Sequence, residues 1–163
     1  MIYVLDTNVF IVLTHYYPST FQSLWARLNK YAETGVIISV REVLNELNQT
    51  NDAGFLQTWV EEHKYIFKKP TNNELLIVQR ILAVPHFQEM ISKKALLRGT
   101  PVADPFVIAA AKSIIDINGV ESAAVVTQER DKPNAAKIPN VCKHVGVPYM
   151  NLNEFMTRQC WVF

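Results

Sequence analysis

Short apolar runs rich in β-branched residues alternate along this chain with amphipathic stretches. Four of these runs are typical of buried strands, because a strand covered on both faces is apolar throughout instead of alternating with polar residues. They span residues 2–5, 36–39, 123–127 and 147–151. Pro148 cannot donate a hydrogen bond to a neighbouring strand. We therefore expect the last strand at an edge of the sheet.

Helical spacing occupies the segments between these runs. Apolar residues three and four positions apart predict helices over about 9–13, 21–31 and 41–49. Alternation of strands and helices predicts a parallel, doubly wound α/β sheet flanked by helices. Residues 51–99 show no convincing strand; they contain helical stretches interrupted at Pro70 and Pro85, with capping-box spacing between Thr71 and Glu74. We expect one domain, 1–163, with a helical insertion at about 51–99 beside the sheet.

Composition narrows the protein class. The chain has 163 residues, of which 49% are hydrophobic and 19% charged, as suits a single domain with a well-buried sheet. Its net charge is only +1, so a nucleic-acid surface would have to be a local basic patch. No apolar run approaches the roughly 20 residues of a membrane span, and the N-terminal run lacks a basic leader. Cys142 and Cys160 match no zinc spacing. We expect a cytoplasmic protein with two reduced thiols and no membrane contact.

Acidic residues follow these apolar runs in order. Asp6 ends the first strand, Glu46 lies on the helix after the second, Asp104 begins an apolar helix, and Glu129 and Asp131 follow the strand at 123–127. The carboxyl ends of parallel strands meet at one crevice. Two like charges 4 Å apart repel by about 4 kcal/mol at an effective dielectric of roughly 20. A divalent cation removes this repulsion, and oxygen ligands suit Mg²⁺ or Mn²⁺. The pattern predicts a metal-dependent phosphoryl-transfer site.

Each acid also has a plain structural explanation. Asp6 is a good N-cap for the helix that follows it, and Asp104 before Pro105 is a good N-cap and helix start. Glu46 could be a solvated helix residue, as could Glu42 one turn earlier on the same face. Glu129 and Asp131 could belong to a polar loop. The joint order of the acids, not any one of them, favours the functional interpretation.

The sequence resembles the PIN-domain family, close to its VapC-type toxin ribonucleases. The similar stretches cover the chain from end to end apart from the helical middle: LDTNV at 5–9, IS…VLNEL at 38–47, ADPFVIAAA at 103–111, VTQERD at 126–131 and GVPYMNLNEF at 146–155. This resemblance implies a PIN-like parallel sheet carrying a ribonuclease site that depends on Mg²⁺ or Mn²⁺. It also implies cleavage that leaves a 5′-phosphate and a 3′-hydroxyl.

The resemblance implies roles for individual residues. Asp6, Glu46 and Asp104 match the first three catalytic, metal-binding acids of the family. The family usually has Asp at the position of Glu129 and often another Asp at that of Asp131, so either residue, or a water bridge, could provide the fourth acid. Two polar residues match positions that support such sites, Asn8 and Thr127.

Basic residues near the acids are candidate RNA contacts, because cations bind the phosphate backbone. Two of them interleave with the last acids and three precede Asp104: Arg130, Lys132, Lys93, Lys94 and Arg98. A solvated surface is the alternative for each group. The resemblance further implies an antitoxin protein as a partner, and a homodimer as in many VapC-type toxins.

Other enzyme classes fit less well. A haloacid-dehalogenase-like phosphatase needs a second Asp two residues after the first, where this chain has Asn8. Neither the GxGxxG nor the GxxxxGK[ST] motif of nucleotide-binding folds occurs. We therefore predict a metal-dependent endoribonuclease, the toxin of a toxin–antitoxin system. A catalytically degenerate PIN-fold RNA-binding or scaffold protein is the main alternative. A DNA nuclease of the same acidic class is a third, although the chain is short for one.

Overall fold

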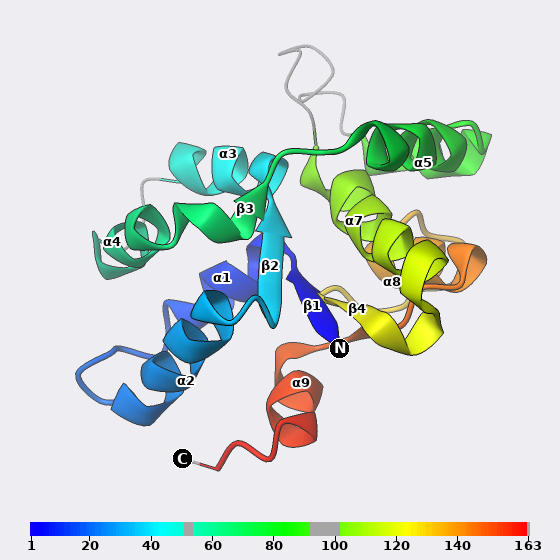
Figure 1. Ribbon diagram of the computed structural model, residues 1–163. Coiled ribbons are helices and arrows are strands. Elements are labelled where there is room, and N and C mark those ends of the chain that lie inside the picture. The colour runs from blue at the N-terminus through cyan, green and yellow to red at the C-terminus, as the bar shows by residue number, and fades with distance from the viewer. Residues whose placement is uncertain (51–53, 92–101, 163) are drawn as a thin grey trace.

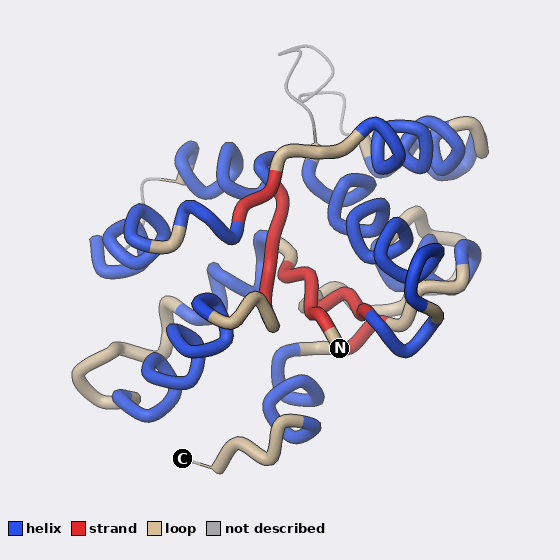
Figure 2. Tube along the Cα trace, viewed as in Figure 1, coloured by secondary structure: helices blue, strands red, loops and turns tan. Residues whose placement is uncertain are grey.

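Five parallel strands form one sheet with helices on both faces (Figures 1 and 2). The computed structural model describes residues 1–50, 54–91 and 102–162. The strands are β1 (Ile2–Leu5), β2 (Ile37–Val40), β3 (Phe67–Lys68), β4 (Ala123–Val126) and β5 (Tyr149–Met150). Their spatial order is β3-β2-β1-β4-β5. The chain therefore reverses direction across the sheet between β1 and β4, and the carboxyl ends of these two strands form its topological switch point.

The strand register aligns the residues that follow β1 and β4. Leu5 lies opposite Val126, so Asp6 and Thr127 begin the two connections side by side. The Asp6 amide donates to the Val126 carbonyl at 3.0 Å, and the Thr127 amide donates to the Met150 carbonyl at 3.0 Å. These bonds extend the sheet ladder by one residue and hold the start of both connections firmly.

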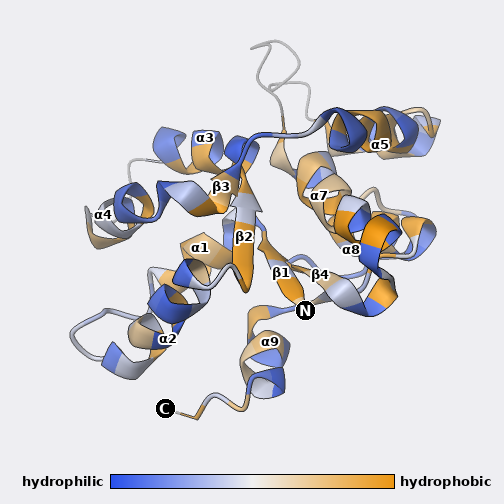
Figure 3. Cartoon of the chain, in the orientation of Figure 1, coloured by the Kyte–Doolittle hydropathy of each residue, from blue (hydrophilic) through white to orange (hydrophobic). Residues whose placement is uncertain are grey.

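Helices cover the sheet on both faces. Helix α7 (Ala103–Asn118) packs across β1, β2 and β4, and α5 (Asn72–Leu82) and α8 (Ile138–Val145) pack on α7. In Figure 1, α2 (Gln22–Glu33) lies on the other side of the sheet from α7. The remaining α-helices are α1 (Thr7–Leu13), α3 (Arg41–Gln49), α4 (Gly54–Glu62) and α9 (Leu152–Arg158). Because both faces are covered, β1 and β2 are strongly apolar (Figure 3), and every residue of β4 is buried.

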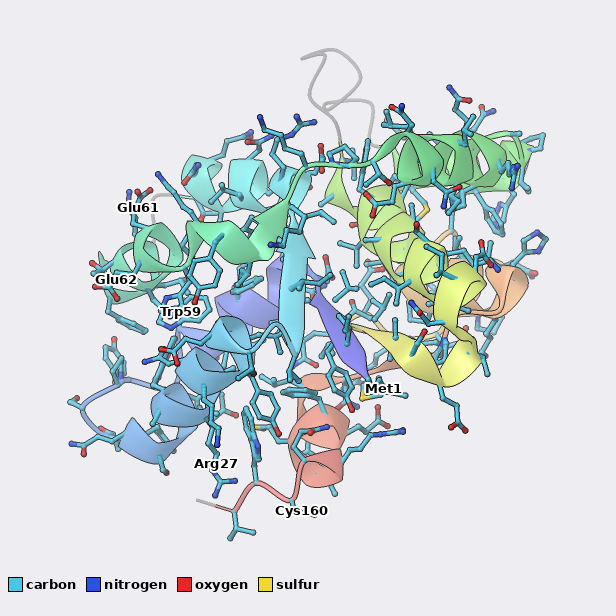
Figure 4. The ribbon with its side chains drawn as sticks, viewed as in Figure 1. Met1, Arg27, Trp59, Glu61, Glu62 and Cys160 are labelled. Atoms are coloured by element: carbon cyan, nitrogen blue, oxygen red, sulfur yellow. The ribbon has the colours of Figure 1, made fainter. Side chains whose placement is uncertain are left out.

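Aromatic side chains fill the space beside α2. The indole of Trp59 stacks on His63, with ring centroids 4.2 Å apart, and donates to the Asn29 side-chain oxygen at 2.6 Å. The C-terminal segment is held on the same side, because the Arg27 guanidinium lies 5.9 Å from the ring centroid of Trp161. Figure 4 shows Trp59 on α4 and Arg27 on α2 in this part of the molecule. Trp59, His63 and Trp161 are buried, so this region forms part of the core.

The predicted α/β fold with a parallel sheet is confirmed, as is the edge position of the last strand. The helix at 41–49 has its predicted bounds, and Thr71 and Glu74 form the predicted capping box. One expectation was wrong: residues 51–99 do contribute a strand, β3, which pairs with β2 at the edge of the sheet. Two residues are too few to show strand periodicity. The predicted helix beyond Phe87 is a 3₁₀ turn over Pro85–Met90, and its continuation past residue 91 lies outside the described residues.

In the described part of the chain, no helix is long and apolar enough to cross a membrane. Both cysteines are free thiols, with Cys142 buried and Cys160 exposed.

Candidate acidic site

Four carboxylates gather at the switch point, and we call them the acidic cluster: Asp6, Glu46, Asp104 and Glu129. Asp6 follows β1 and Glu129 follows β4, while Glu46 lies on α3 and Asp104 in the first turn of α7. Each of the other three charges raises the pKa of Asp104. The tertiary structure thus brings together acids from four separate segments of the chain, at the edge where the sequence pattern places them.

Asp6 is the most buried member, with 2% of its surface exposed. One carboxylate oxygen accepts from the Thr7 amide at 2.7 Å, so Asp6 is the N-cap of α1. The other accepts from the Thr127 hydroxyl at 2.8 Å. The pKa of Asp6 is raised to about 6, chiefly by burial and also by the charges of Glu129 and Glu46, against the opposing effect of these two hydrogen bonds. The proposed capping role of Asp6 is confirmed.

Glu46 lies on α3 and accepts a hydrogen bond from the first residue of α7. Its Oε1 accepts from the amide of Ala103, the first residue of α7, at 3.0 Å, and its Oε2 accepts from the Thr7 hydroxyl at 2.5 Å. The N-cap residue of α7 is Val102, which has no side-chain oxygen to offer. Glu46 therefore satisfies an amide that the helix geometry leaves without a partner, and it ties α3 to α1 and α7.

Glu129 satisfies the first amide of α8 in the same way. Its Oε2 accepts from the amide of Ile138, the first residue of α8, at 2.8 Å. The N-cap residue Lys137 makes no capping bond to its own helix; its ammonium instead donates to Glu129 Oε1 at 2.6 Å. The Glu129 amide donates to the Thr127 hydroxyl at 3.1 Å, which anchors the start of the connection from β4.

Asp104 differs from the other three members. None of the described residues donates a hydrogen bond to its carboxylate. The pKa of Asp104 is raised to about 8, chiefly by burial and then by the charges of Asp6, Glu129 and Glu46, while Lys137 acts in the opposite direction. The alternative explanation of Asp104 as an N-cap was wrong, because α7 begins at Ala103 with Val102 as the cap and Glu46 accepts from the Ala103 amide. The structure thus gives Asp104 burial and like-charge repulsion without a described compensating donor.

The other predicted residues take distinct places. Asp131 is exposed and pairs with Lys143 of α8; it is not among the main causes of the raised pKa of Asp6 or Asp104. The side-chain oxygen of Asn8 accepts from the Gln128 amide at 2.9 Å and so joins α1 to the connection after β4. Glu42 is fully buried, so the expectation of a solvated side chain there was wrong.

Two of the five predicted RNA-binding cations lie within the described residues. Arg130 and Lys132 are exposed on the connection after β4, and Arg130 lines an open groove of about 460 Å³ beside β5. The other three, Lys93, Lys94 and Arg98, lie outside the described residues. Two cations near this edge were not predicted. Lys137 contacts the cluster directly, and Arg41 follows β2 with its guanidinium 2.8 Å from the buried Glu42 carboxylate. The sequence held a signal for Lys137, because this residue directly precedes the Ile-Pro pair that begins α8.

The donor set of the cluster fits a hard cation, because it consists of carboxylate oxygens without sulfur or imidazole. In the residues the structure describes, no three Asp, Glu, His or Cys side chains are already arranged as metal ligands. The oxygens of Glu46 and Glu129 instead bind helix amides and side-chain donors. Mg²⁺ takes one or two direct carboxylates and keeps several waters. Asp104, whose carboxylate accepts no hydrogen bond from the described residues, would therefore hold the ion directly. The three hydrogen-bonded acids would each add a free lone pair or act through a coordinated water.

Comparison with known proteins gives a fold-level similarity and a family. A crystal structure of VapBC2 from Rickettsia felis, bound to a DNA fragment from their promoter, aligns with 93% of this chain and 98% of the matched chain, at 16% identity and a TM-score of 0.49. Similarity at this level assigns no activity to the present chain. No curated protein matches the sequence significantly. A family model matches residues 3–163. The chain belongs to the family described as a domain of unknown function, DUF4411.

Proposed function

We propose that this protein is a metal-dependent endoribonuclease whose acidic cluster holds Mg²⁺ or Mn²⁺. The observation that carries the proposal is Asp104, a carboxylate with a pKa raised to about 8 by burial and by three neighbouring acids. Strongly perturbed groups of this kind concentrate at functional sites. The location supports the same proposal, since ligands of open α/β sheets bind at the switch point. The resemblance of the motifs around these acids to VapC-type ribonucleases supports RNA as the substrate.

Each residue of the site would have its own role in cleavage. A bound divalent cation lowers the pKa of a coordinated water and stabilises the charge that develops on the phosphodiester. Asp6 and Asp104 would bind the cation, while Thr127 orients the Asp6 carboxylate through its 2.8 Å hydrogen bond. Glu46 and Glu129 fix the first turns of α7 and α8 beside the site. Arg130 and Lys132, exposed on the adjoining connection, would contact the RNA phosphates.

The role as the toxin of a toxin–antitoxin system rests on the sequence resemblance to VapC-type toxins. The same resemblance supports an antitoxin partner and a homodimer. Both proposals are tested by copurification with the product of an adjacent small gene and by measuring the mass of the purified protein in solution.

The direct test is cleavage of end-labelled RNA with Mn²⁺ or Mg²⁺ and with EDTA. Wild-type protein should give discrete products only with metal, and Asp104→Asn should lose nearly all of them. Asp131→Asn is the matched control, because it removes an acid from the same region that lies outside the cluster. Equal inactivity of wild type and Asp104→Asn, with both proteins folded and free of partner, would overturn the proposal.

One observation favours the alternative of a binding or scaffold protein without catalysis. Asp6, Glu46 and Glu129 each accept from the first amide of a helix, and so each has a structural role of its own. If these acids served only as caps, the protein would bind RNA equally well in EDTA and in Mg²⁺. RNA binding measured by fluorescence anisotropy under both conditions distinguishes the two functions.

A further inference from the structure

Lys137 is the one described cation that both bonds to a member of the acidic cluster and lowers the pKa of Asp104. Its ammonium lies 2.6 Å from Glu129 Oε1. In the structure, then, a side chain of the protein itself compensates part of the charge that a metal ion would compensate.

The two partners of this ion pair differ in freedom. The Lys137 side chain is 51% exposed, whereas that of Glu129 is 15% exposed. Glu129 is also held by the Ile138 amide through its second oxygen. Lysine carries its charge on a flexible four-carbon stem. When a stronger cation arrives, Lys137 is therefore the partner that can leave, and Glu129 is the partner that stays.

A second ion pair in the same part of the fold provides a contrast. Lys143 of α8, the helix that Lys137 precedes as N-cap, pairs with Asp131 on the same connection after β4. Asp131 is not among the main causes of the raised pKa of Asp6 or Asp104. The described residues thus contain two Lys–carboxylate pairs in this part of the fold, and only the Lys137–Glu129 pair belongs to the acidic cluster.

We propose that Lys137 is a displaceable counter-ion of the acidic cluster, which competes with the divalent cation for Glu129 and, once released, binds the phosphodiester of the RNA at the site. This inference rests on the proposed function and adds a positioning residue to it. Before metal binds, Lys137 reduces the repulsion among the four carboxylates. After metal binds, its ammonium is free, adjacent to the cation, and attracted by the negative phosphate.

The first experiment is a titration of the protein with Mn²⁺ alone, followed by isothermal calorimetry. Lys137→Met should bind Mn²⁺ about fivefold more tightly than wild type, since a partly exposed ion pair is worth up to about 1 kcal/mol. Lys137→Arg keeps the charge and should stay near wild type. Lys143→Met removes the same charge from the other pair and should change the affinity less than about twofold, because its pair lies outside the cluster.

A double-mutant cycle separates competition at Glu129 from the general field of one positive charge. Glu129→Gln retains an oxygen for the Ile138 amide but cannot form the ion pair. In that background Lys137→Met should no longer tighten Mn²⁺ binding, because the two residues act on each other. An equal tightening in both backgrounds would overturn the competition, and thermal unfolding of each variant confirms that it is folded.

The second experiment measures binding of a single-stranded RNA oligonucleotide in Ca²⁺ by fluorescence anisotropy at several salt concentrations. Lys137→Met should weaken binding and lower the slope of log affinity against log salt by about one, as expected for the loss of one phosphate contact. Lys143→Met should leave the slope unchanged. The opposite effects of one variant, tighter metal and weaker RNA, are the signature of the proposal.

The two proposals fail separately. If wild type bound neither Mn²⁺ nor Mg²⁺, the proposed function itself would fail. If wild type bound metal and cleaved RNA while Lys137→Met matched Lys143→Met in both assays, only the role of Lys137 would be overturned.

Discussion

The acidic cluster has two parts, which differ in the hydrogen bonds that the protein donates to their carboxylates. Asp6, Glu46 and Glu129 each accept hydrogen bonds from a helix amide and from a side chain. Asp104 accepts none from the described residues, and the charges of the other three raise its pKa. The first three acids are thus integrated into the start of α1, α7 and α8, whereas Asp104 is destabilised where it stands.

The contrast separates stability from function within one site. A hydrogen-bonded carboxylate that also caps a helix is explained by folding alone. A partly buried carboxylate under repulsion is costly to the fold, and the proposed cation would offset this cost. Removing the charge of Asp104 should therefore affect activity and stability in opposite directions, which is common where a site trades stability for function.

The largest expected effect is on catalysis. Asp104→Asn should lower the rate of RNA cleavage by about 10²–10³-fold, because metal-ion catalysis supplies several kcal/mol of transition-state stabilisation. Asp131→Asn should stay within about twofold, as for a surface substitution away from the site. Single-turnover cleavage of a defined RNA measures both, and equal losses in the two variants would remove the distinction between Asp131 and the cluster.

The next effect is on the pH dependence of stability without metal. The pKa of Asp104 is raised to about 8 in the folded state, so the folded state holds more protons than the unfolded state from about pH 4 to 8. The free energy of unfolding should fall as pH rises through this window, by up to about 1.4 kcal/mol per pH unit and group. Urea unfolding in EDTA should show a shallower fall for Asp104→Asn.

Metal binding should oppose this fall of stability with rising pH. Because the cation binds the ionised carboxylates, Mn²⁺ affinity should rise with pH as Asp6 and Asp104 lose their protons, chiefly between about pH 6 and 8. Calorimetric titrations in buffers with different ionisation enthalpies count the protons released. Release of no protons at pH 7 would contradict direct binding to Asp104.

The capping acids should show the converse behaviour in stability. Glu46→Ala removes the acceptor for the first amide of α7 and should lower the free energy of unfolding by about 1–2 kcal/mol. Glu129→Ala should do the same at α8. In contrast, Asp104→Asn should leave the metal-free protein as stable as wild type or more stable at pH 8. Chemical unfolding in EDTA compares all three.

The smallest expected effect tests the support of Asp6. Thr127→Val keeps the shape of the side chain but removes the hydroxyl that donates to Asp6, and it should lower the free energy of unfolding by about 1 kcal/mol. That hydrogen bond lowers the pKa of Asp6, so its loss should raise this pKa further. An NMR titration of the Asp6 carboxyl group measures the shift, and an unchanged pKa would show that burial alone controls it.

Local patterns were sufficient for most of the sheet. The run Ile2–Leu5 became β1 with the bounds it was given. Its register with β4 is seen only in the structure, because two strands that are apolar on both faces have no alternation that would fix it. The two-residue strand β3 was missed, because such a short segment has no period of its own and forms only by pairing with β2. Its position depends on a partner that lies about 30 residues away in the sequence.

The sequence by itself determined the order of the acids and, through the strand–helix alternation, the edge of the sheet at which they meet. Only the tertiary structure decided what each acid does there. Glu46 caps α7, Glu129 caps α8 and pairs with Lys137, and Asp131 pairs with Lys143. Each of these roles depends on contacts between separate segments of the chain. The physical reason is that the ionisation of a carboxylate depends on its burial and on the donors and charges within a few ångströms, which a linear pattern of residue types does not contain.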